Sequence, residues 1–499
     1  MFVRFLAPIA LFAAIPAFAQ AIAPEAIRRH IDVLASDAFE GREPGTEGEK
    51  KTIAYIAGQM RAIGLEPGAD GSFYQPVEVI ERKPGDQHIV FQGRKKKRDR
   101  VELDRDSILL LGRSERETIA GAPVIFAGHG AVAKELGIDQ LGGADLKGAI
   151  VFILYEGPHT DSFPAYSDRV KSVAARGAAA VIGIVGADMS WPIMQRIYDG
   201  GQNRLAIDPP APIHGYLSMA AAQRLFAAAR ADLIAAMPGE PVAFKPMALK
   251  LRGSLDVTTS VRRIATHNVA GRLRGSGATG ESLLYLGHWD HLGICEPDAA
   301  DRICNGAVDN ASGIAAMLEI ARALARGPRP KRDVLFVATT SEEKGLLGAQ
   351  YFAERPIVPR ASIVAAINLD TVAIAARGEK VAVIGRGDPA MDAILDTVIR
   401  ESGRVLDEDD EAAAFVTRQD GWALQRAGIP ALMIGGSFAD MKKLQAFLQG
   451  PYHSAADNPG PQVELGGAAE DADLMVRLGR KLADPAVYKR CGGAGGNEP

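Results

Sequence analysis

The chain has 499 residues, of which 47% are hydrophobic and 24% are charged, and its formal net charge is -4. This is ordinary globular composition, long enough for two or more domains. So small a net charge provides no overall field to attract nucleic acid or an anionic membrane, and neither is expected as a partner.

The first residues, MFVRFLAPIALFAAIPAFAQ, have the pattern of a secretory signal peptide. Arg4 supplies the positive n-region, residues 5–16 the apolar h-region, and residues 17–19 (Ala-Phe-Ala) a small-x-small cleavage site. We therefore expect residues 1–19 to be removed and the mature protein to be exported, to the periplasm or the extracellular space. No later segment has the roughly 20 apolar residues of a spanning helix, so no stable membrane span is expected.

Two amphipathic helices are predicted next. Ile27, Ile31 and Leu34 fall on one helical stripe, and a second stripe runs through residues 53–63. From about residue 120 the pattern changes to short apolar strands, Gly-rich turns and one Ala-rich helix. The segments DLKGAIV (residues 145–151) and GAAAVI (residues 177–182) resemble the protease-associated domain, which implies a noncatalytic, β-rich insert over residues 120–250 that borders a substrate cleft.

The C-terminal half is typical of an α/β domain. The strand candidates alternate with helical patterns, and they are SLLYLG (282–287), DVLFVATT (333–340), IVAAINLD (363–370), KVAVIG (380–385) and IPALMIGG (429–436). Such continuous apolar strands predict a mostly parallel sheet covered on both faces. We assign residues 20–119 and 251–488 to this discontinuous domain and expect a disordered tail over residues 489–499.

Metal-type ligands follow these strands. His288 and Asp290 follow the first, Glu342 and Glu343 the second, and Asp370 the third. The carboxyl ends of parallel strands meet at one edge of a sheet, so these side chains should converge there. Asp309, in the turn NGAVDNASG, and His453, in PYHS, are further candidates. Taken alone, Asp309 is equally typical of a helix N-cap.

Convergence of Asp309, Glu343 and Asp370 would be costly without cations, because like carboxylates at short range raise one another's pKa. Two Zn²⁺ balance three ligand carboxylates and one hydroxide, so the shell becomes neutral. Two imidazoles and three carboxylates suit two zinc ions that share one carboxylate and keep a water as nucleophile. Since side chains alternate along a strand, Glu343 can bind metal while Glu342 reaches the water as a general base.

These residues together resemble the two-zinc aminopeptidase family, which includes leucine aminopeptidases and relatives of glutamate carboxypeptidase and the transferrin receptor. The resemblance covers roughly residues 25–75 and 255–485 and implies a three-layer, phosphorylase/hydrolase-like zinc exopeptidase fold. It also implies a set of roles: His288 and Asp370 bind one zinc, Glu343 and His453 the other, Asp309 bridges, Glu342 is the general base, Asp290 orients His288, and Tyr452 donates to the oxyanion. The implied substrate is a peptide with a free N-terminus.

Several alternatives stay open at this stage. A carboxypeptidase that releases glutamate, a glutaminyl cyclase and a noncatalytic receptor-like protein share parts of the pattern. Cys295 and Cys304 are close enough in sequence to form a disulfide in an oxidising compartment, which we favour over thiolate ligands. His291 is expected to line the cleft or to form a hydrogen bond, while Arg418 and Asp420 are candidates for substrate contact. The sequence does not determine the oligomeric state, the preferred residue or the physiological metal.

Overall fold

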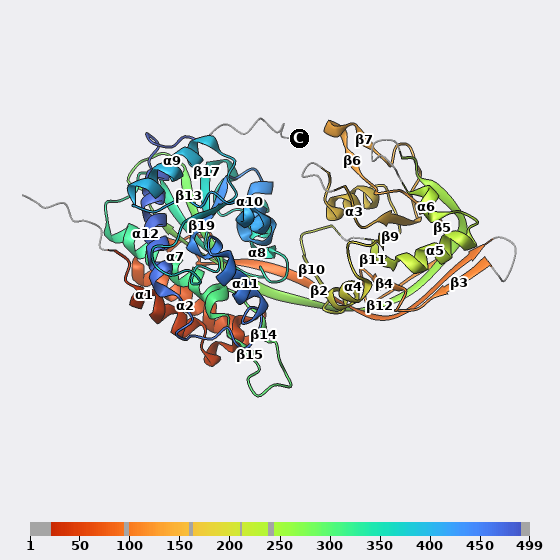
Figure 1. Ribbon diagram of the computed structural model, residues 1–499, viewed down its shortest axis with the longest axis horizontal. Coiled ribbons are helices and arrows are strands. Elements are labelled where there is room, and N and C mark those ends of the chain that lie inside the picture. The colour runs from red at the N-terminus through yellow and green to blue at the C-terminus, as the bar shows by residue number, and fades with distance from the viewer. Residues whose placement is uncertain (1–20, 94–98, 159–162, 210–211, 238–243, 491–499) are drawn as a thin grey trace, which may run out of the picture. The chain divides into compact units, whose positions relative to one another are not determined.

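The structure is a computed structural model that describes residues 21–93, 99–158, 163–209, 212–237 and 244–490. The predicted signal peptide and nearly all of the predicted disordered tail lie outside the described residues. The chain forms two compact units (Figure 1): unit 1 comprises Met1–Val77 and Ala265–Pro499, and unit 2 comprises Glu78–Ile264.

Unit 1 is built on a mostly parallel sheet, as predicted. Its strands lie in the order β18, β19, β17, β13, β16, β12. The central strands β13, β16, β17 and β19 run parallel to one another, whereas β18 and the final residues of β12 pair antiparallel at the two sides. The strand bounds are Met247–Leu273 (β12), Ser282–His288 (β13), Asp333–Thr339 (β16), Ile363–Asn368 (β17), Ala382–Ile384 (β18) and Ala431–Gly435 (β19), with short pairs Glu66–Pro67 (β1), Gly293–Ile294 (β14) and Ile303–Cys304 (β15).

Both faces of this sheet are buried under helices. Along β13, Leu283 and Tyr285 enter the larger core, and Leu284 and Leu286 enter the core on the opposite face. This alternation follows from the two-residue period of a strand, and it explains why β13 has no polar side until His288. The helices are Pro24–Leu34 (α1), Glu47–Ile63 (α2), Gly313–Arg326 (α7), Leu347–Glu354 (α8), Pro389–Glu401 (α9), Asp420–Arg426 (α10), Met441–Gln449 (α11) and Leu465–Leu482 (α12).

The two predicted N-terminal helices are present. Ile27, Ile31 and Leu34 of α1 are buried in the larger core. α2 begins at the Thr46 cap, whose hydroxyl accepts the backbone N–H of Glu49, and it ends at Gly64, which adopts a left-handed conformation (φ 93°). In the part of the chain that the structure describes, we find no helix with both the length and the apolar content to cross a membrane.

Unit 2 has its own hydrophobic core. Its strands lie in the order β12, β5, β8, β9, β11, β4, and β5, β8, β9 and β11 are parallel. The strands are Tyr74–Gly93 (β2), Arg100–Leu103 (β3), Ile108–Leu111 (β4), Arg116–Phe126 (β5), Val132–Ala133 (β6), Ile138–Asp139 (β7), Ile150–Leu154 (β8), Ala180–Val185 (β9), Gln202–Leu205 (β10) and Ile213–Ser218 (β11). The helices are Tyr166–Ala174 (α3), Trp191–Asp199 (α4), Met219–Ala228 (α5) and Leu233–Ala236 (α6).

Unit 2 is wider than the insert expected over residues 120–250. Residues 78–119 and 251–264, which the sequence pattern predicts for the α/β domain, lie in unit 2. The reason is strand pairing: β4 pairs antiparallel with β11, and β3 pairs with β2, so these strands are completed inside unit 2. The assignment of this unit as a protease-associated domain stays a prediction.

A buried histidine predicts acid sensitivity for unit 2. Burial, together with a smaller effect of the Arg82 guanidinium, lowers the pKa of His214 to about 4. Below the ordinary pKa of histidine the unfolded chain therefore binds a proton that the folded unit does not bind. The contribution of His214 to stability is complete above about pH 6.5 and should fall by about 3 kcal/mol as the pH drops to about 4. Urea unfolding at pH 7 and pH 4.5 measures this loss.

The variant His214→Gln should lose the part of this pH dependence that comes from His214, and the remainder comes from His129, whose pKa burial likewise lowers to about 4. His88→Gln is the control, since the His88 side chain is 66% exposed, and it should retain the wild-type difference between the two pH values. An unchanged difference in His214→Gln would refute the assignment.

Candidate metal centre

The strands of unit 1 deliver the candidate ligands to one edge of the sheet. His288 is the last residue of β13, Asp370 lies two residues after β17, and Glu343 follows β16. Asp309 lies in the turn Ala307–Ser312, immediately before α7. The peptide bond between Asp309 and Asn310 is cis. Side chains distant in sequence thus meet where the parallel strands end.

Asp309 is the centre of this cluster. Its Oδ1 lies 3.3 Å from His288 Nε2, and its Oδ2 lies 3.3 Å from His453 Nε2. His288 Nε2 is also 3.5 Å from Asp370 Oδ1, and His453 Nε2 is 2.9 Å from Glu343 Oε2. Two atoms bound to one tetrahedral zinc at about 2.0–2.1 Å lie roughly 3.3 Å apart. The five predicted ligands therefore fit two cation positions that share Asp309.

Glu342 lies beside this cluster. Its ligand atom and those of His288 and Asp370 lie within 4.8 Å of one another. Burial raises the pKa of Glu342 well above its ordinary value; His288 opposes this shift and Glu343 adds to it. A buried carboxylate with a raised pKa is suited to proton transfer.

The structure modifies the role expected of Asp290. Its carboxylate Oδ1 lies 3.9 Å from His288 Nδ1, beyond hydrogen-bond distance, while its backbone oxygen lies 3.1 Å from that nitrogen. The carboxylate instead accepts the backbone N–H of Glu342 at 3.1 Å. Asp290 therefore orients His288 through its main chain and fixes the start of the Glu342 segment through its side chain.

Two supporting residues were not identified from the sequence in these roles. The buried carboxylate of Asp457 accepts the backbone N–H groups of Val308 and Asp309, at 2.9 and 3.0 Å, so it holds the turn that carries Asp309. The Arg42 guanidinium, in the turn GREPGT, donates to the backbone oxygens of Trp289 and Gly306, both at 2.9 Å. Burial lowers the pKa of Arg42 to about 10, and nearby carboxylates oppose the shift, Asp309 most strongly. In the sequence, the only local indication of this role is an arginine in a turn-rich link.

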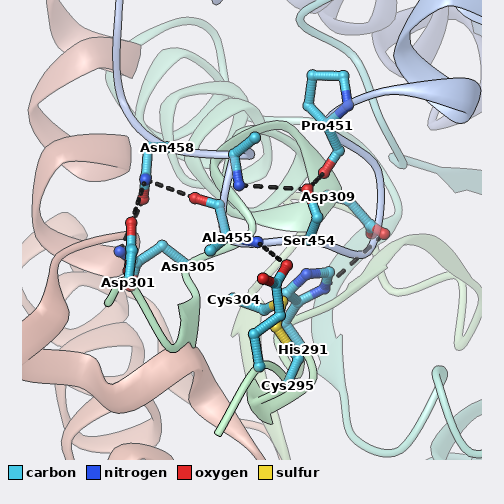
Figure 2. Close-up of a disulfide and its surroundings, with 12 residues drawn as sticks. His291, Cys295, Asp301, Cys304, Asn305, Asp309, Pro451, Ser454, Ala455 and Asn458 are labelled. Carbon is cyan, nitrogen blue, oxygen red and sulfur yellow. Dashed lines mark hydrogen bonds and ion pairs between the residues drawn. A yellow bond between two sulfur atoms is a disulfide. The ribbon is translucent and has the colours of Figure 1, made fainter. Parts of the chain in front are cut away.

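The disulfide closes a hairpin beside the cluster, as the sequence led us to expect. Cys295 and Cys304 are bonded, and they join the ends of β14 and β15 next to His291 (Figure 2). Asn305 follows directly and donates to Asn458 Oδ1 at 2.8 Å, so the hairpin is tied to the loop that carries His453.

A pocket with polar and apolar walls adjoins the cluster. Asp370 and Tyr452 lie in its wall. The Tyr452 ring stacks on the His453 ring at a centroid distance of 3.7 Å. Arg418 lies in the wall with its guanidinium 5.6 Å from the Phe415 ring. The remaining lining residues are Thr371, Gln419, Met433, Phe438, Leu444 and Leu448.

Asp420, the other candidate for substrate contact, is buried and does not line this pocket. Its Oδ2 accepts the hydroxyl of Thr339, and burial raises its pKa to about 6. It packs behind the cluster from the start of α10.

The part of the chain that holds the candidate ligands is similar to known proteins. Residues 268–475 match the model of Peptidase family M28. A probable zinc metalloprotease of Pyrenophora teres f. teres (strain 0-1) is 39% identical over 104 residues, which are 21% of this chain and 22% of that protein. A second probable zinc metalloprotease, from Pyricularia oryzae, is 26% identical over 193 residues, 37% of each chain. The matches thus span well under half the length of these curated relatives.

The fold is also that of a solved peptidase structure. The aminopeptidase from Aneurinibacillus sp. strain AM-1 superimposes with a TM-score of 0.55 and 18% sequence identity, over 93% of this chain and 95% of that chain. Residues 268–475, which match the model of Peptidase family M28, hold all five candidate ligands and Glu342.

Proposed function

We propose that this protein is an exported aminopeptidase that binds two zinc ions and removes the N-terminal residue of peptides, acting in the periplasm or outside the cell. The observation that carries the proposal is the position of Asp309, whose two oxygens face His288 and His453 at 3.3 Å each. His288 and Asp370 would hold one ion, and Glu343 and His453 the other. Zinc bound there supplies Lewis-acid polarisation of a carbonyl and acidifies water.

The chain's own groups then perform the proton transfers. Glu342 takes the proton of the attacking water and returns it to the leaving amine, which a carboxylate with a raised pKa does efficiently near neutral pH. Burial raises the pKa of Tyr452 as well, and Asp309 and Glu343 add to the shift. The phenol therefore keeps its proton and can donate a hydrogen bond to the developing oxyanion.

The pocket supports cleavage at an N-terminal residue. Its wall joins Asp370 and Tyr452 to apolar side chains such as Met433 and Leu444. An apolar N-terminal side chain can be buried there, while the acidic cluster receives the free amine. Arg418 is the one cation in the described lining of this pocket, which is fewer than a clasp for a C-terminal carboxylate usually needs.

A substrate panel tests the proposal directly. We expect hydrolysis of leucyl and methionyl chromogenic amides, loss of activity with a chelator and recovery with Zn²⁺. N-acetylated versions of the same amides should be inert, since they lack the free amine. Cleavage of N-blocked peptides that end in glutamate would favour a carboxypeptidase. Cyclisation of N-terminal glutamine would favour a glutaminyl cyclase, and no turnover with zinc bound would favour a receptor-like protein.

A further inference from the structure

His291 is a buried histidine that the proposed mechanism does not use. It lies one residue after Asp290, and its side chain is fully buried. Its Nδ1 lies 2.7 Å from Glu343 Oε1 and 3.8 Å from Asp309 Oδ2 (Figure 2 shows the ring beside the disulfide). Its other ring nitrogen, Nε2, is buried and has no hydrogen-bond partner among the described residues. The hydrogen bond that the ring makes is therefore the one with Glu343, a candidate metal ligand.

The distances separate a ligand from a hydrogen-bond donor. Each histidine assigned as a ligand has two carboxylate oxygens around its Nε2: His288 has those of Asp309 and Asp370 at 3.3 and 3.5 Å, and His453 has those of Asp309 and Glu343 at 3.3 and 2.9 Å. His291 Nδ1 has only one oxygen this close, Glu343 Oε1 at 2.7 Å, which is a distance typical of a charge-assisted N–H···O bond, while Asp309 Oδ2 lies 3.8 Å away. The contact is thus that of a donor and its acceptor.

The ring is fixed in this orientation by its surroundings. Gly306 has a left-handed backbone (φ 57°), and a Cβ there would lie 2.7 Å from His291 Cδ2 and Cγ. On another side the His453 ring meets it edge-on at a centroid distance of 5.7 Å. The disulfide hairpin begins two residues later, at Gly293. A rotation that broke the contact with Glu343 would have to displace one of these neighbours.

We propose that His291 is a positioning residue that donates its Nδ1–H to Glu343 Oε1 and so holds Glu343 as a ligand through Oε2 alone. Oε2 is the oxygen that lies 2.9 Å from His453 Nε2. This inference rests on the proposed function, which identifies the ligands. It concerns only the cation position that Glu343 and His453 would share. Without the donor, Glu343 would more often rotate away from its ligand orientation, and the position next to His453 would bind its ion more weakly.

The test measures zinc binding by the full-length protein, with a chelator as competitor, so that two binding steps are resolved. His291→Phe keeps the ring and removes the donor. One step should weaken about 10- to 100-fold and the other should keep its affinity, since the partners of metal ligands have effects of this size. His291→Gln retains an N–H donor and should restore part of the lost affinity. Unchanged binding of both equivalents in His291→Phe would overturn the proposal.

His30→Phe is the matched control. His30 is a second buried histidine of unit 1, and its Nε2 lies 3.0 Å from Glu319 Oε1, a pair outside the ligand cluster. It should leave both binding steps unchanged. The unfolding midpoint of each metal-free variant shows whether a loss is structural. If both steps weaken equally and the midpoint of metal-free His291→Phe falls, the role is structural and the proposal fails.

Absorption of the Co²⁺-loaded protein distinguishes positioning from direct ligation. Removal of a nitrogen ligand changes the coordination and hence the Co²⁺ bands, whereas removal of a positioning donor lowers occupancy and leaves the bands in place. A changed spectrum at full occupancy would make His291 a ligand and refute the donor role. Because the readout is metal binding, the result stands even if the wild-type protein binds two zinc ions and cleaves no peptide. In that case only the proposed function fails.

Discussion

Replacing Glu342 with glutamine should lower kcat by about 10²- to 10⁴-fold while both zinc ions stay bound, because loss of a general base has an effect of this size. The glutamine amide has the shape of the carboxylate but cannot accept the proton of the attacking water. The KM for a leucyl amide should change little, since substrate binding does not need that proton transfer. Steady-state kinetics and metal analysis on the same preparation give both quantities.

The metal analysis is essential because Glu342 lies close to two candidate ligands. Its ligand atom is within 4.8 Å of those of His288 and Asp370, so it could in principle complete a cation site there. The neighbouring variant Glu343→Gln is the matched control, since it makes the same chemical change one residue away. It should lose both activity and one equivalent of zinc. Zinc loss in Glu342→Gln, or activity near that of the wild type, would contradict its assignment as the base.

Replacing Asp309 with alanine should have the larger effect, because it removes a ligand from both cation positions at once. Each position would keep two protein ligands, His288 with Asp370 and Glu343 with His453, and tetrahedral zinc sites in proteins usually have at least three. We expect the protein to retain less than one zinc ion per chain after dialysis and to have no activity above the chelated wild type. Metal analysis and kinetics at saturating Zn²⁺ test this.

Asp388→Asn is the control for this experiment. Asp388 is also a buried aspartate of unit 1, but its Oδ1 accepts backbone N–H groups at the start of α9, at 3.0–3.1 Å. This variant should lose some stability and keep both zinc ions. Retention of two zinc ions by Asp309→Ala would show that Asp309 does not bridge, and the two-position arrangement would have to be abandoned.

The sequence by itself determined the parallel sheet and most of the candidate site. Strands such as 282–288 are apolar on both sides, which only a sheet covered on both faces explains. Parallel strands also end at a common edge, so His288, Glu343 and Asp370 could be expected to meet without any knowledge of the packing. The Cys295–Cys304 disulfide could also be predicted from the sequence, since the two cysteines are separated by only 9 residues.

Only the tertiary structure decided which groups hold these ligands in place. Arg42 reaches Gly306, and Asp457 reaches the backbone of Asp309, across 264 and 148 residues of chain, and no local pattern encodes such contacts. The boundary of unit 2 depends in the same way on the pairing of β4 with β11. The sequence shows that His291 is a histidine close to predicted ligands. Its hydrogen bond with Glu343, however, depends on how the ends of β13 and β16 approach each other. The periodicity of a sequence indicates which face of a helix or strand is buried, whereas tertiary packing determines which residues lie against that face. The ligands of this candidate metal centre are held in place by such packed residues.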